Sequence, residues 1–324
     1  MDFFKNKISL ENKEELESFL NSFPHETSGL SFSSIYMWSR EYTYTYEIIE
    51  DYLCIAGLSN FENEEEAPFL FPLLPREGRW EKEKLRCVFD LLIQRFSDIG
   101  KPFVMRLVPE NLRKIYEEAM PEQFVFIDDP SNADYIHLTE DLAALRGKRF
   151  HGKKNHLNRF NTLYASECKV VPMSSSMTEE ALELVKCINQ VKEVSYCERL
   201  LLDGELEMMQ KILPDFEKIG LEGVAIRIGG KLQAFAFGGR LGDDTIVEHV
   251  EKANVAYTGI YQKLNNEFCR AAERRYRYVN REEDMGLEGL RKSKMSYKPL
   301  RLVEKQIMLL QGDEKALECY GNPY

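Results

Sequence analysis

The chain has 324 residues, enough for about two domains, and its 44% hydrophobic and 11% aromatic content is sufficient to fill two cores. Its 54 acidic and 43 basic residues give a formal net charge of −11 at pH 7, which argues against binding to duplex DNA, since that needs a basic face over much of the surface. No stretch approaches the ~18 consecutive apolar residues of a membrane span, and no secretory apolar segment follows the first charges, so we expect a cytoplasmic protein without a membrane span.

In the N-terminal half, apolar residues recur at the helical period in three segments and alternate in three others. The predicted helices span residues 12–21, 82–96 and 110–120, and the predicted strands span residues 42–49, 103–108 and 134–139. Between them, residues 60–75 join an acidic run to three prolines, which predicts a loop.

Positive charge is concentrated near the middle of the chain. From Arg146 to Ser166 there is no acidic residue, and six basic residues leave a charge of −17 on the rest of the molecule. These six are Arg146, Lys148, Arg149, Lys153, Lys154 and Arg159. A cationic patch on an anionic protein indicates a docking site for an anion, which His151, Asn155 and His156 within the patch would help to bind. An alternative is an interdomain helix whose cations neutralise acids of the partner domain.

The C-terminal half has a clearer order of elements. Predicted helices span residues 178–191, 204–216 and 258–274, and predicted strands span residues 223–228, 232–241, 245–251 and 276–282. A Gly229-Gly230 turn joins the first two of these strands, which predicts an antiparallel meander followed by a β-α-β crossover. We therefore predict an α+β protein of two domains, residues 1–143 and 144–324, each with a mixed, mostly antiparallel sheet flanked by helices.

The strand predicted at residues 245–251 carries ionisable groups between apolar neighbours. Alternation places Glu248 with Ile246 and Val250 on one face, and His249 with Glu251 on the other. A buried strand that displays Glu and His must pair them or shift their protonation, which is how general acids and bases arise. A structural salt bridge is the alternative interpretation.

Charged residues also gather after the strand predicted at 276–282. Asn280, Glu282 and Asp284 alternate along its end, and a short helical run follows Gly286 and Gly289. The cations of this run are Arg291, Lys294 and Lys298. The end of a strand in a sheet with crossovers is a common place for a binding site, although a solvated loop explains the same charges.

Other site types find little support in the sequence. Gly259 lies at the start of a predicted helix, where free N–H groups favour a phosphate, but a GxGxxG or GxxxxGK[ST] loop is absent. The sequence contains neither HExxH nor GxSxG, and its seven cysteines show no CxxC spacing. We therefore expect no metal site and no disulfide framework.

Four segments resemble the DUF2156 family, which is similar to the soluble C-terminal domain of phosphatidylglycerol lysyltransferases. They are residues 145–160, 247–253, 259–268 and 280–299, and the resemblance extends over nearly the whole chain. It implies two GNAT-like acyltransferase domains in tandem, as in the Fem aminoacyltransferases that use aminoacyl-tRNA, with the active site in the C-terminal domain.

The resemblance implies an acyl or aminoacyl transfer from a phosphate-bearing donor to an amine or hydroxyl, with acyl-CoA or aminoacyl-tRNA as co-substrate and no covalently bound cofactor. We expect Glu248 or His249 to act as base, Glu282 or Asp284 to hold the amine, and N–H groups at Gly238-Gly239 to stabilise the oxyanion. The residues expected to bind the donor are Lys148, Arg149, His151, Lys153, Lys154, Asn155, His156, Arg159, Gly259, Tyr261, Arg291 and Lys294. The alternative is a non-catalytic GNAT-like module that binds RNA or a nucleotide through its basic groove. The oligomeric state is left open.

Overall fold

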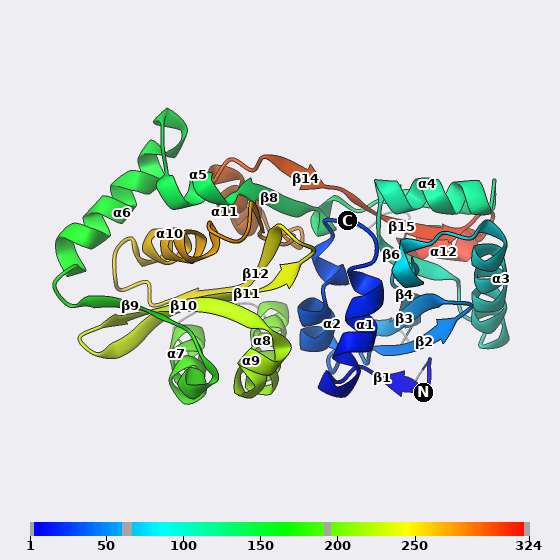
Figure 1. The fold of residues 1–324 in the computed structure, drawn as a ribbon, viewed down its shortest axis with the longest axis horizontal. Helices are drawn as coiled ribbons and strands as arrows, with labels where there is room; N and C mark the ends of the chain where they lie inside the picture. Colours follow the sequence, from blue (N-terminus) through cyan, green and yellow to red (C-terminus); the bar gives the residue numbers. More distant parts are fainter. Residues whose placement is uncertain (1–2, 60–66, 191–195, 321–324) are drawn as a thin grey trace. The chain divides into compact units, whose positions relative to one another are not determined.

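The structure is a computed structural model, and it describes residues 3–59, 67–190 and 196–320. Two mixed sheets with helices packed on them make up the fold (Figure 1). The α+β class expected from the sequence is therefore confirmed. Within the described ranges, every helix is too short or too polar to cross a lipid bilayer.

The chain divides into two compact units that are not continuous in sequence. Unit 1 comprises residues 1–134, 283–286 and 303–324, and unit 2 comprises residues 135–282 and 287–302. A single division between residues 143 and 144, as expected from the sequence, does not coincide with these units. The reason is that the chain returns to unit 1 after residue 302 and adds a strand to its sheet.

The sheet of unit 1 has the strand order β1-β2-β3-β4-β6-β15-β7, with β5 paired to β3. Its strands are β1 (Asn6–Lys7), β2 (Thr45–Ile49), β3 (Tyr52–Ser59), β4 (Ala67–Leu70), β5 (Leu74–Pro75), β6 (Val104–Pro109), β7 (Phe124–Asp128) and β15 (Lys305–Leu310). The last strand, β15, lies between β6 and β7 and pairs antiparallel with both. The C-terminal segment therefore completes the interior of this sheet.

The helices of unit 1 pack through amphipathic faces. They are α1 (Lys13–Leu20), α2 (Phe32–Trp38), α3 (Lys82–Asp98), α4 (Glu110–Ala119) and α12 (Glu314–Tyr320). In α3, Leu85, Phe89, Leu92 and Phe96 recur at the helical period and are all buried. The loop predicted at residues 60–75 is wrong for β4 and β5, where pairing with β3 overrides the prolines; residues 60–66 lie outside the described part.

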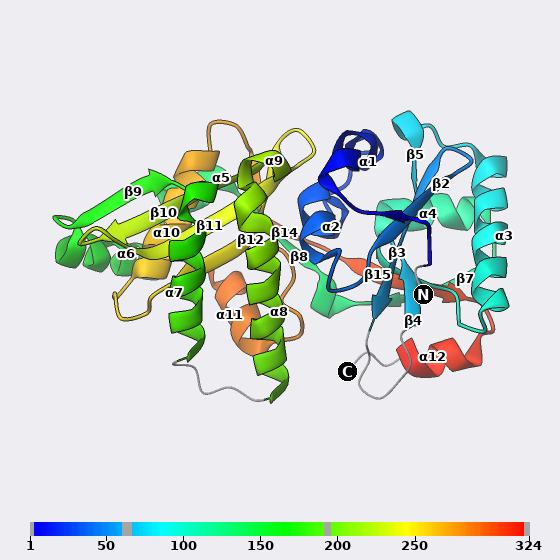
Figure 2. The ribbon, with the colours of Figure 1, turned by 90° about the horizontal axis from the view of Figure 1, so that it is seen from below.

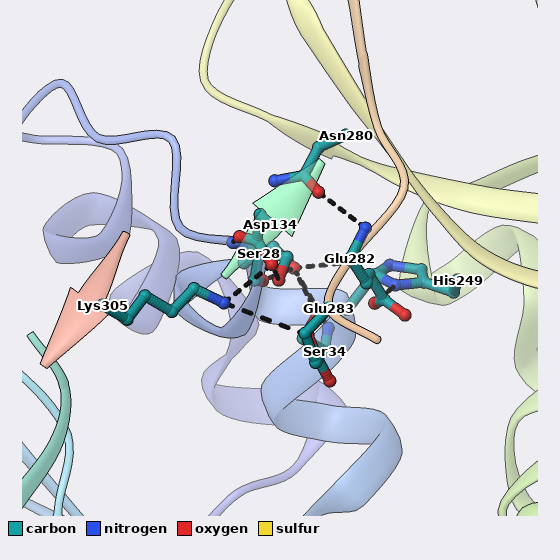
Figure 3. A network of polar contacts seen from close by, with 10 residues as sticks. Ser28, Ser34, Asp134, His249, Asn280, Glu282, Glu283 and Lys305 are labelled. Atoms are coloured by element: carbon teal, nitrogen blue, oxygen red, sulfur yellow. Dashed lines mark hydrogen bonds and ion pairs between the residues drawn. The ribbon is translucent and has the colours of Figure 1, made fainter. Parts of the chain in front are cut away.

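A buried polar network in unit 1 centres on Asp134 (Figure 3). Lys305 Nζ lies 2.7 Å from Asp134 Oδ1, and the two side chains are 1% and 0% exposed. The hydroxyl of Ser28 donates to the same oxygen at 2.8 Å, and the Ser28 backbone N–H donates to Oδ2 at 2.7 Å. Glu283 Oε2 is 3.9 Å from Lys305 Nζ. Because a buried charge without its partner is very costly, this network ties β15 to two distant segments of the chain.

The sheet of unit 2 has the strand order β14-β8-β13-β12-β11-β10-β9. Its strands are β8 (Asp134–Leu138), β9 (Cys168–Pro172), β10 (Leu221–Ile228), β11 (Lys231–Leu241), β12 (Thr245–Ala253), β13 (Tyr278–Asn280) and β14 (Arg301–Val303). Strands β10, β11 and β12 form an antiparallel meander, and β13 pairs parallel with β12. The meander and the β-α-β crossover predicted from the sequence are confirmed.

Helices cover both faces of the unit 2 sheet (Figures 1 and 2). They are α5 (Thr139–Ala144), α6 (His151–Tyr164), α7 (Thr178–Gln190), α8 (Tyr196–Ile212), α9 (Phe216–Ile219), α10 (Ile260–Ala272) and α11 (Glu288–Ser296). The crossover helix α10 presents Ile260, Leu264 and Phe268, spaced four apart, to the core that it shares with α5 and α6. Helices α7, α8 and α9 pack on the other face (Figure 2), where Phe216 meets Phe237.

The predicted helices at 12–21, 82–96 and 110–120 correspond to α1, α3 and α4. The helix predicted at 178–191 corresponds to α7, and its last residue lies outside the described part. The helix predicted at 204–216 begins earlier and ends earlier, as α8. Six of the seven cysteines are free thiols, as expected, and the side chain of Cys197 is not among those described.

Candidate functional site

The candidate site lies where the parallel ladder between β12 and β13 of unit 2 ends. Strands β12 and β13 pair over only three residues each, and the last pair is Val247 with Asn280. The next residues along the two strands are Glu248 and Arg281, so a carboxylate and a guanidinium follow the end of the ladder. The carboxyl ends of neighbouring parallel strands are a preferred place for a ligand in sheets with crossovers.

A β-bulge shapes this strand end. Phe237 of β11 pairs with Val250 of β12, whereas Gly238 pairs with Glu248, so His249 is the extra residue of β12. An extra residue shifts the alternation beyond it by one position. The prediction that Glu248 and Glu251 lie on opposite faces is therefore wrong, and both carboxylates contact the same guanidinium.

Gly238 makes the bulge possible. A Cβ on this residue would collide with the carbonyl oxygen of Val247 in β12. Gly238 and Gly239 also lie inside β11 and pair with β10 on one side and β12 on the other. This position favours a role in the close approach of two backbones over the predicted role of their N–H groups in stabilising an oxyanion.

Arg281 forms the centre of a buried charge cluster, which we define as Arg281, Glu248 and Glu251. Arg281 Nε donates to Glu248 Oε2 at 2.5 Å, and Arg281 Nη2 donates to Glu251 Oε2 at 2.9 Å. The side chains of Arg281, Glu248 and Glu251 are 8%, 3% and 18% exposed. Within the described residues, the buried atoms Glu248 Oε1, Glu251 Oε1 and Arg281 Nη1 have no hydrogen-bond partner. Such atoms are rare in proteins and point to a missing ligand group or water.

The acidic and basic groups of the cluster do not balance, because two carboxyl groups face one guanidinium. Burial and, next, the charge of Glu248 raise the pKa of Glu251 to about 8, although Arg281, Lys153 and Lys294 oppose the rise. Burial disfavours the charge on Arg281, but Glu248 and Glu251 outweigh it and raise the pKa of the guanidinium. Glu251 is therefore the member of the cluster that holds a proton near neutral pH.

Two predicted cations from distant segments lie beside this cluster. Lys153 of α6 places Nζ 3.8 Å from the ring centroid of Tyr297, whose other neighbour is Arg281 at 4.9 Å. Burial lowers the pKa of Lys153, and Arg281 lowers it further. Lys294 of α11 lies 5.8 Å from the ring of Tyr135 and acts electrostatically on Glu251. Lys153 and Lys294, which come from distant segments, thus both act on Glu251 of the Arg281 cluster.

The other predicted donor-binding residues lie around the periphery of unit 2. Arg149 Nη2 lies 2.5 Å from Asp141 Oδ2. Both residues belong to unit 2, so this pair does not neutralise an acid of the other unit, as the alternative of an interdomain helix requires. Arg291 is exposed on α11, and burial and then Glu251 raise the pKa of Tyr261 on α10 to about 12. The other predicted residues on α6 and just before it are exposed, namely Lys148, His151, Lys154, Asn155, His156 and Arg159.

Gly259 precedes α10 in the left-handed conformation, with φ at 84°. A Cβ there would collide with the carbonyl oxygen of His156 in α6. We expect Gly259→Ala to lower the free energy of unfolding by about 1–3 kcal/mol, because backbone strain adds to the collision. Urea unfolding measures this, with Gly152→Ala in α6 as control, since a Cβ at Gly152 meets nothing within 4 Å. Equal stabilities of the two variants would contradict a packing role for Gly259.

Of the four predicted catalytic residues, Glu248, His249 and Glu282 belong to unit 2 and Asp284 belongs to unit 1. His249 Nδ1 lies 2.7 Å from Glu282 Oε1, and the His249 side chain is fully buried (Figure 3). Glu282 has a left-handed φ of 56° and donates its backbone N–H to Asn280 Oδ1 at 2.8 Å. Asp284 belongs to unit 1, where its Oδ1 accepts the N–H of Gly286 at 2.9 Å and shapes a turn.

Sequence reasoning missed Glu251, Arg281 and Tyr297 as site residues. Arg281 stands between Asn280 and Glu282 in the sequence. Strict alternation places Asn280 and Glu282 on one face of the strand and Arg281 on the other, so Arg281 was not included in the predicted site. The bulge leaves one signal in the sequence, the pair Gly238-Gly239 opposite two ionisable residues, because glycine inside a strand often marks such an irregularity.

The family model described as phosphatidylglycerol lysyltransferase, C-terminal, matches residues 20–309. A conserved protein of unknown function from Bacteroides thetaiotaomicron is 32% identical, with a TM-score of 0.82 over 96% of this chain and 100% of that chain. The C-terminal DUF2156 domain of a putative lysylphosphatidylglycerol synthetase from Agrobacterium fabrum is 11% identical, with a TM-score of 0.66 over 96% of this chain and 95% of that chain.

The structure of L-PGS from Bacillus licheniformis is 12% identical, with a TM-score of 0.63 over 94% of this chain and 92% of that chain. At 11 and 12% identity, these two likenesses show the fold alone, which extends over more than nine tenths of each chain. The DUF2156 resemblance of the four sequence segments is confirmed by the family match. The match covers most of the chain, and this protein therefore belongs to the family of phosphatidylglycerol lysyltransferase C-terminal domains.

Proposed function

We propose that this protein is an aminoacyltransferase that moves an aminoacyl group from aminoacyl-tRNA to an amine or hydroxyl acceptor. The observation that carries the proposal is the buried Arg281 cluster, which combines donor and acceptor atoms that lack a partner among the described residues, at the end of the parallel ladder between β12 and β13. Membership of a family described by lysyl transfer supports the reaction class. One structure with the same fold is described as the C-terminal domain of a putative lysylphosphatidylglycerol synthetase, and another is described as L-PGS.

His249 is suited to the proton transfers of this reaction. In the neutral tautomer with its proton on Nδ1, the ring donates to Glu282 Oε1, which fixes its orientation, and Nε2 is the nitrogen that can take up a proton. The acceptor then loses its proton to Nε2 as its nitrogen or oxygen bonds to the ester carbonyl carbon. The bond from that carbon to the terminal ribose oxygen breaks, and His249 returns the proton to the ribose oxygen. Glu248 is less suited to act as base, because Arg281 engages one of its oxygens.

The exposed cations of α6 are suited to hold the tRNA. A helix of period 3.6 separates neighbouring residues by about 100°, so Lys153 turns toward Tyr297 while Lys154 faces solvent. Lys154 and Arg159 are exposed on a segment without any acid, in a protein of net charge −11. Phosphate contacts of this kind position a nucleic acid and depend strongly on salt.

We expect the double variant Lys154→Glu, Arg159→Glu to bind aminoacyl-tRNA roughly 10- to 100-fold more weakly and to lower the slope of log affinity against log salt by about two. Filter binding across a salt series measures both quantities. Lys186→Glu is the matched control, because Lys186 is exposed on α7 at the other face of the sheet. Equal losses in both variants would contradict a specific role for α6.

The transfer itself is tested with tRNA charged with radiolabelled amino acids and with a panel of amine and hydroxyl acceptors, including anionic lipids. We expect label to move from tRNA to an acceptor, and His249→Ala to abolish this movement while tRNA binding persists. Salt-dependent binding without any transfer would instead establish the non-catalytic RNA-binding module. If neither transfer nor binding occurs, the proposed function is wrong.

A further inference from the structure

The sheet of unit 1 repeats the strand order on which the candidate site of unit 2 is built. Strands β2, β3 and β4 form an antiparallel meander, α3 crosses over, and β6 pairs parallel with β4. Unit 2 has the same succession of pairings in β10, β11, β12, α10 and β13. The end of the β4–β6 ladder in unit 1 is therefore the counterpart of the end of the β12–β13 ladder in unit 2.

An arginine follows the end of the ladder in both units. The β4–β6 ladder reaches Met105, and the next residue of β6 is Arg106. It corresponds to Arg281, the residue after the last pair of the β12–β13 ladder. The residues that follow the two arginines, Leu107 and Glu282, both have a left-handed backbone, with φ at 61° and 56°. Because residues with a Cβ rarely adopt this conformation, the shared bend indicates that Arg106 and Arg281 hold equivalent positions in the two units.

Aromatic rings lie beside Arg106, whereas two carboxyl groups contact Arg281. The Arg106 guanidinium lies over Phe69 of β4, with its Cζ 5.5 Å from the ring centroid. Tyr44 packs edge-on against Phe69 at a centroid distance of 6.4 Å, and Tyr42 stacks on Tyr44 at 5.7 Å. Tyr44 and Phe69 are buried, but Tyr42 is 37% exposed. A row of rings thus leads from the guanidinium to an aromatic face that solvent reaches.

The half-buried guanidinium of Arg106 carries its charge without a paired carboxylate. Among the described residues it forms no ion pair, and its buried Nε atom has no hydrogen-bond partner. Burial raises the pKa values of Tyr42 and Tyr44, and the charge of Arg106 opposes this rise, so both phenols lie within the field of the guanidinium. Glu283 acts on the same two tyrosines, but its carboxylate has Lys305 Nζ at 3.9 Å. A buried donor of this kind is rare and points to a missing acceptor group or water.

We propose that unit 1 carries a second ligand site, centred on Arg106, for a small carboxylic acid with a planar aromatic body. A guanidinium offers two parallel N–H donors that match one carboxylate, and its single charge balances the charge of one such group. The exposed ring of Tyr42 gives the aromatic body of the ligand a face on which to stack. The site lies wholly within unit 1 and does not depend on aminoacyl transfer in unit 2.

Calorimetry with the full chain tests this proposal through binding alone. The probes are benzoate, phenylacetate and indole-3-acetate. The control ligands are benzamide, which keeps the ring without the charge, and acetate, which keeps the charge without the ring. We expect at least one of the aromatic acids to bind with one ligand per chain, and benzamide and acetate to bind at least tenfold more weakly than that acid.

Arg106→Gln is expected to weaken the binding of that acid at least tenfold, because the ion pair and its charged hydrogen bonds are lost. Arg40→Gln is the matched control, since Arg40 is an exposed cation of the same unit, two residues before Tyr42. The control variant should bind the acid as the unaltered protein does. Circular dichroism establishes that both variants fold.

Tyr42 provides an independent pair of variants, which decides the question if Arg106→Gln does not fold. Tyr42→Ala removes the stacking face and should weaken binding about three- to tenfold. Tyr42→Phe keeps the face and should bind the acid as the unaltered protein does. Because the Tyr42 side chain is partly exposed, we expect both variants to fold.

Any of four results would overturn the proposal. The first is that none of the aromatic acids binds up to about 50 mM ligand, and the second is that benzamide or acetate binds as tightly as the acid. The third is unchanged affinity in Arg106→Gln, and the fourth is equal affinity in Tyr42→Ala and Tyr42→Phe. All of these measurements are independent of the transfer of label, so the site in unit 1 and the proposed function fail separately.

Discussion

Arg281→Ala is expected to lower the free energy of unfolding by about 3–5 kcal/mol at pH 7. The substitution leaves Glu248, whose side chain is 3% exposed, without its counter-charge, and it removes the hydrogen-bond donor of Glu251. The loss should grow above pH 8, where Glu251 of the native protein releases its proton while the buried carboxyl group of the variant, without the guanidinium, keeps it. Urea unfolding at several pH values measures both effects.

Arg275→Ala is the matched control for this variant. Arg275 pairs with Glu222 at 2.6 Å, but its side chain is 61% exposed, so we expect a loss of about 0–1 kcal/mol. A second control combines Arg281→Met with Glu248→Gln and Glu251→Gln, which removes all the charges and should recover part of the stability. If Arg281→Ala costs no more than Arg275→Ala, the cluster is not the buried centre described above.

Lys305→Ala is expected to cost a similar amount, about 3–5 kcal/mol, in unit 1. Lys305 is the cation nearest the fully buried Asp134, at 2.7 Å, and the two Ser28 donors cannot replace its charge. The loss should be accompanied by weaker protection of the β15 amides from hydrogen exchange, because Lys305 is the first residue of that strand.

Lys315→Ala provides the comparison, because Lys315 is exposed on α12 close to Lys305 in sequence. Its effect should remain within about 0.5 kcal/mol. A loss in Lys305→Ala that is equally small, with unchanged exchange in β15, would show that the Asp134 network does not hold this strand in place.

The sequence predicts the centre of unit 2 better than its edges. The meander from β10 to β12 alternates regularly and turns at Gly229-Gly230, and α10 carries a clear apolar stripe. Strand β15 could not be placed, because its position between β6 and β7 depends on contacts some two hundred residues apart in sequence. A local pattern carries no information about such pairing.

Two cations beside the candidate site were predictable from the sequence, but the cluster at its centre was not. Lys153 and Lys294 were expected to converge from separate segments, and they lie around one cluster. The pairing of Arg281 with both Glu248 and Glu251 depends on the bulge at His249. One inserted residue reverses the face of every later side chain in a strand, and alternation read from letters does not detect it.

The position of β15 has a consequence for the order of assembly on the ribosome. All seven strands of the unit 2 sheet have been synthesised once Val303 has emerged, whereas β6 and β7 of unit 1 still await the strand between them. Nascent domains fold as their last strand becomes available. Unit 1, which contains the N-terminus, is thus the later unit to complete its fold. During translation its sheet still lacks β15, and the unpaired edges of β6 and β7 are exposed to chaperones.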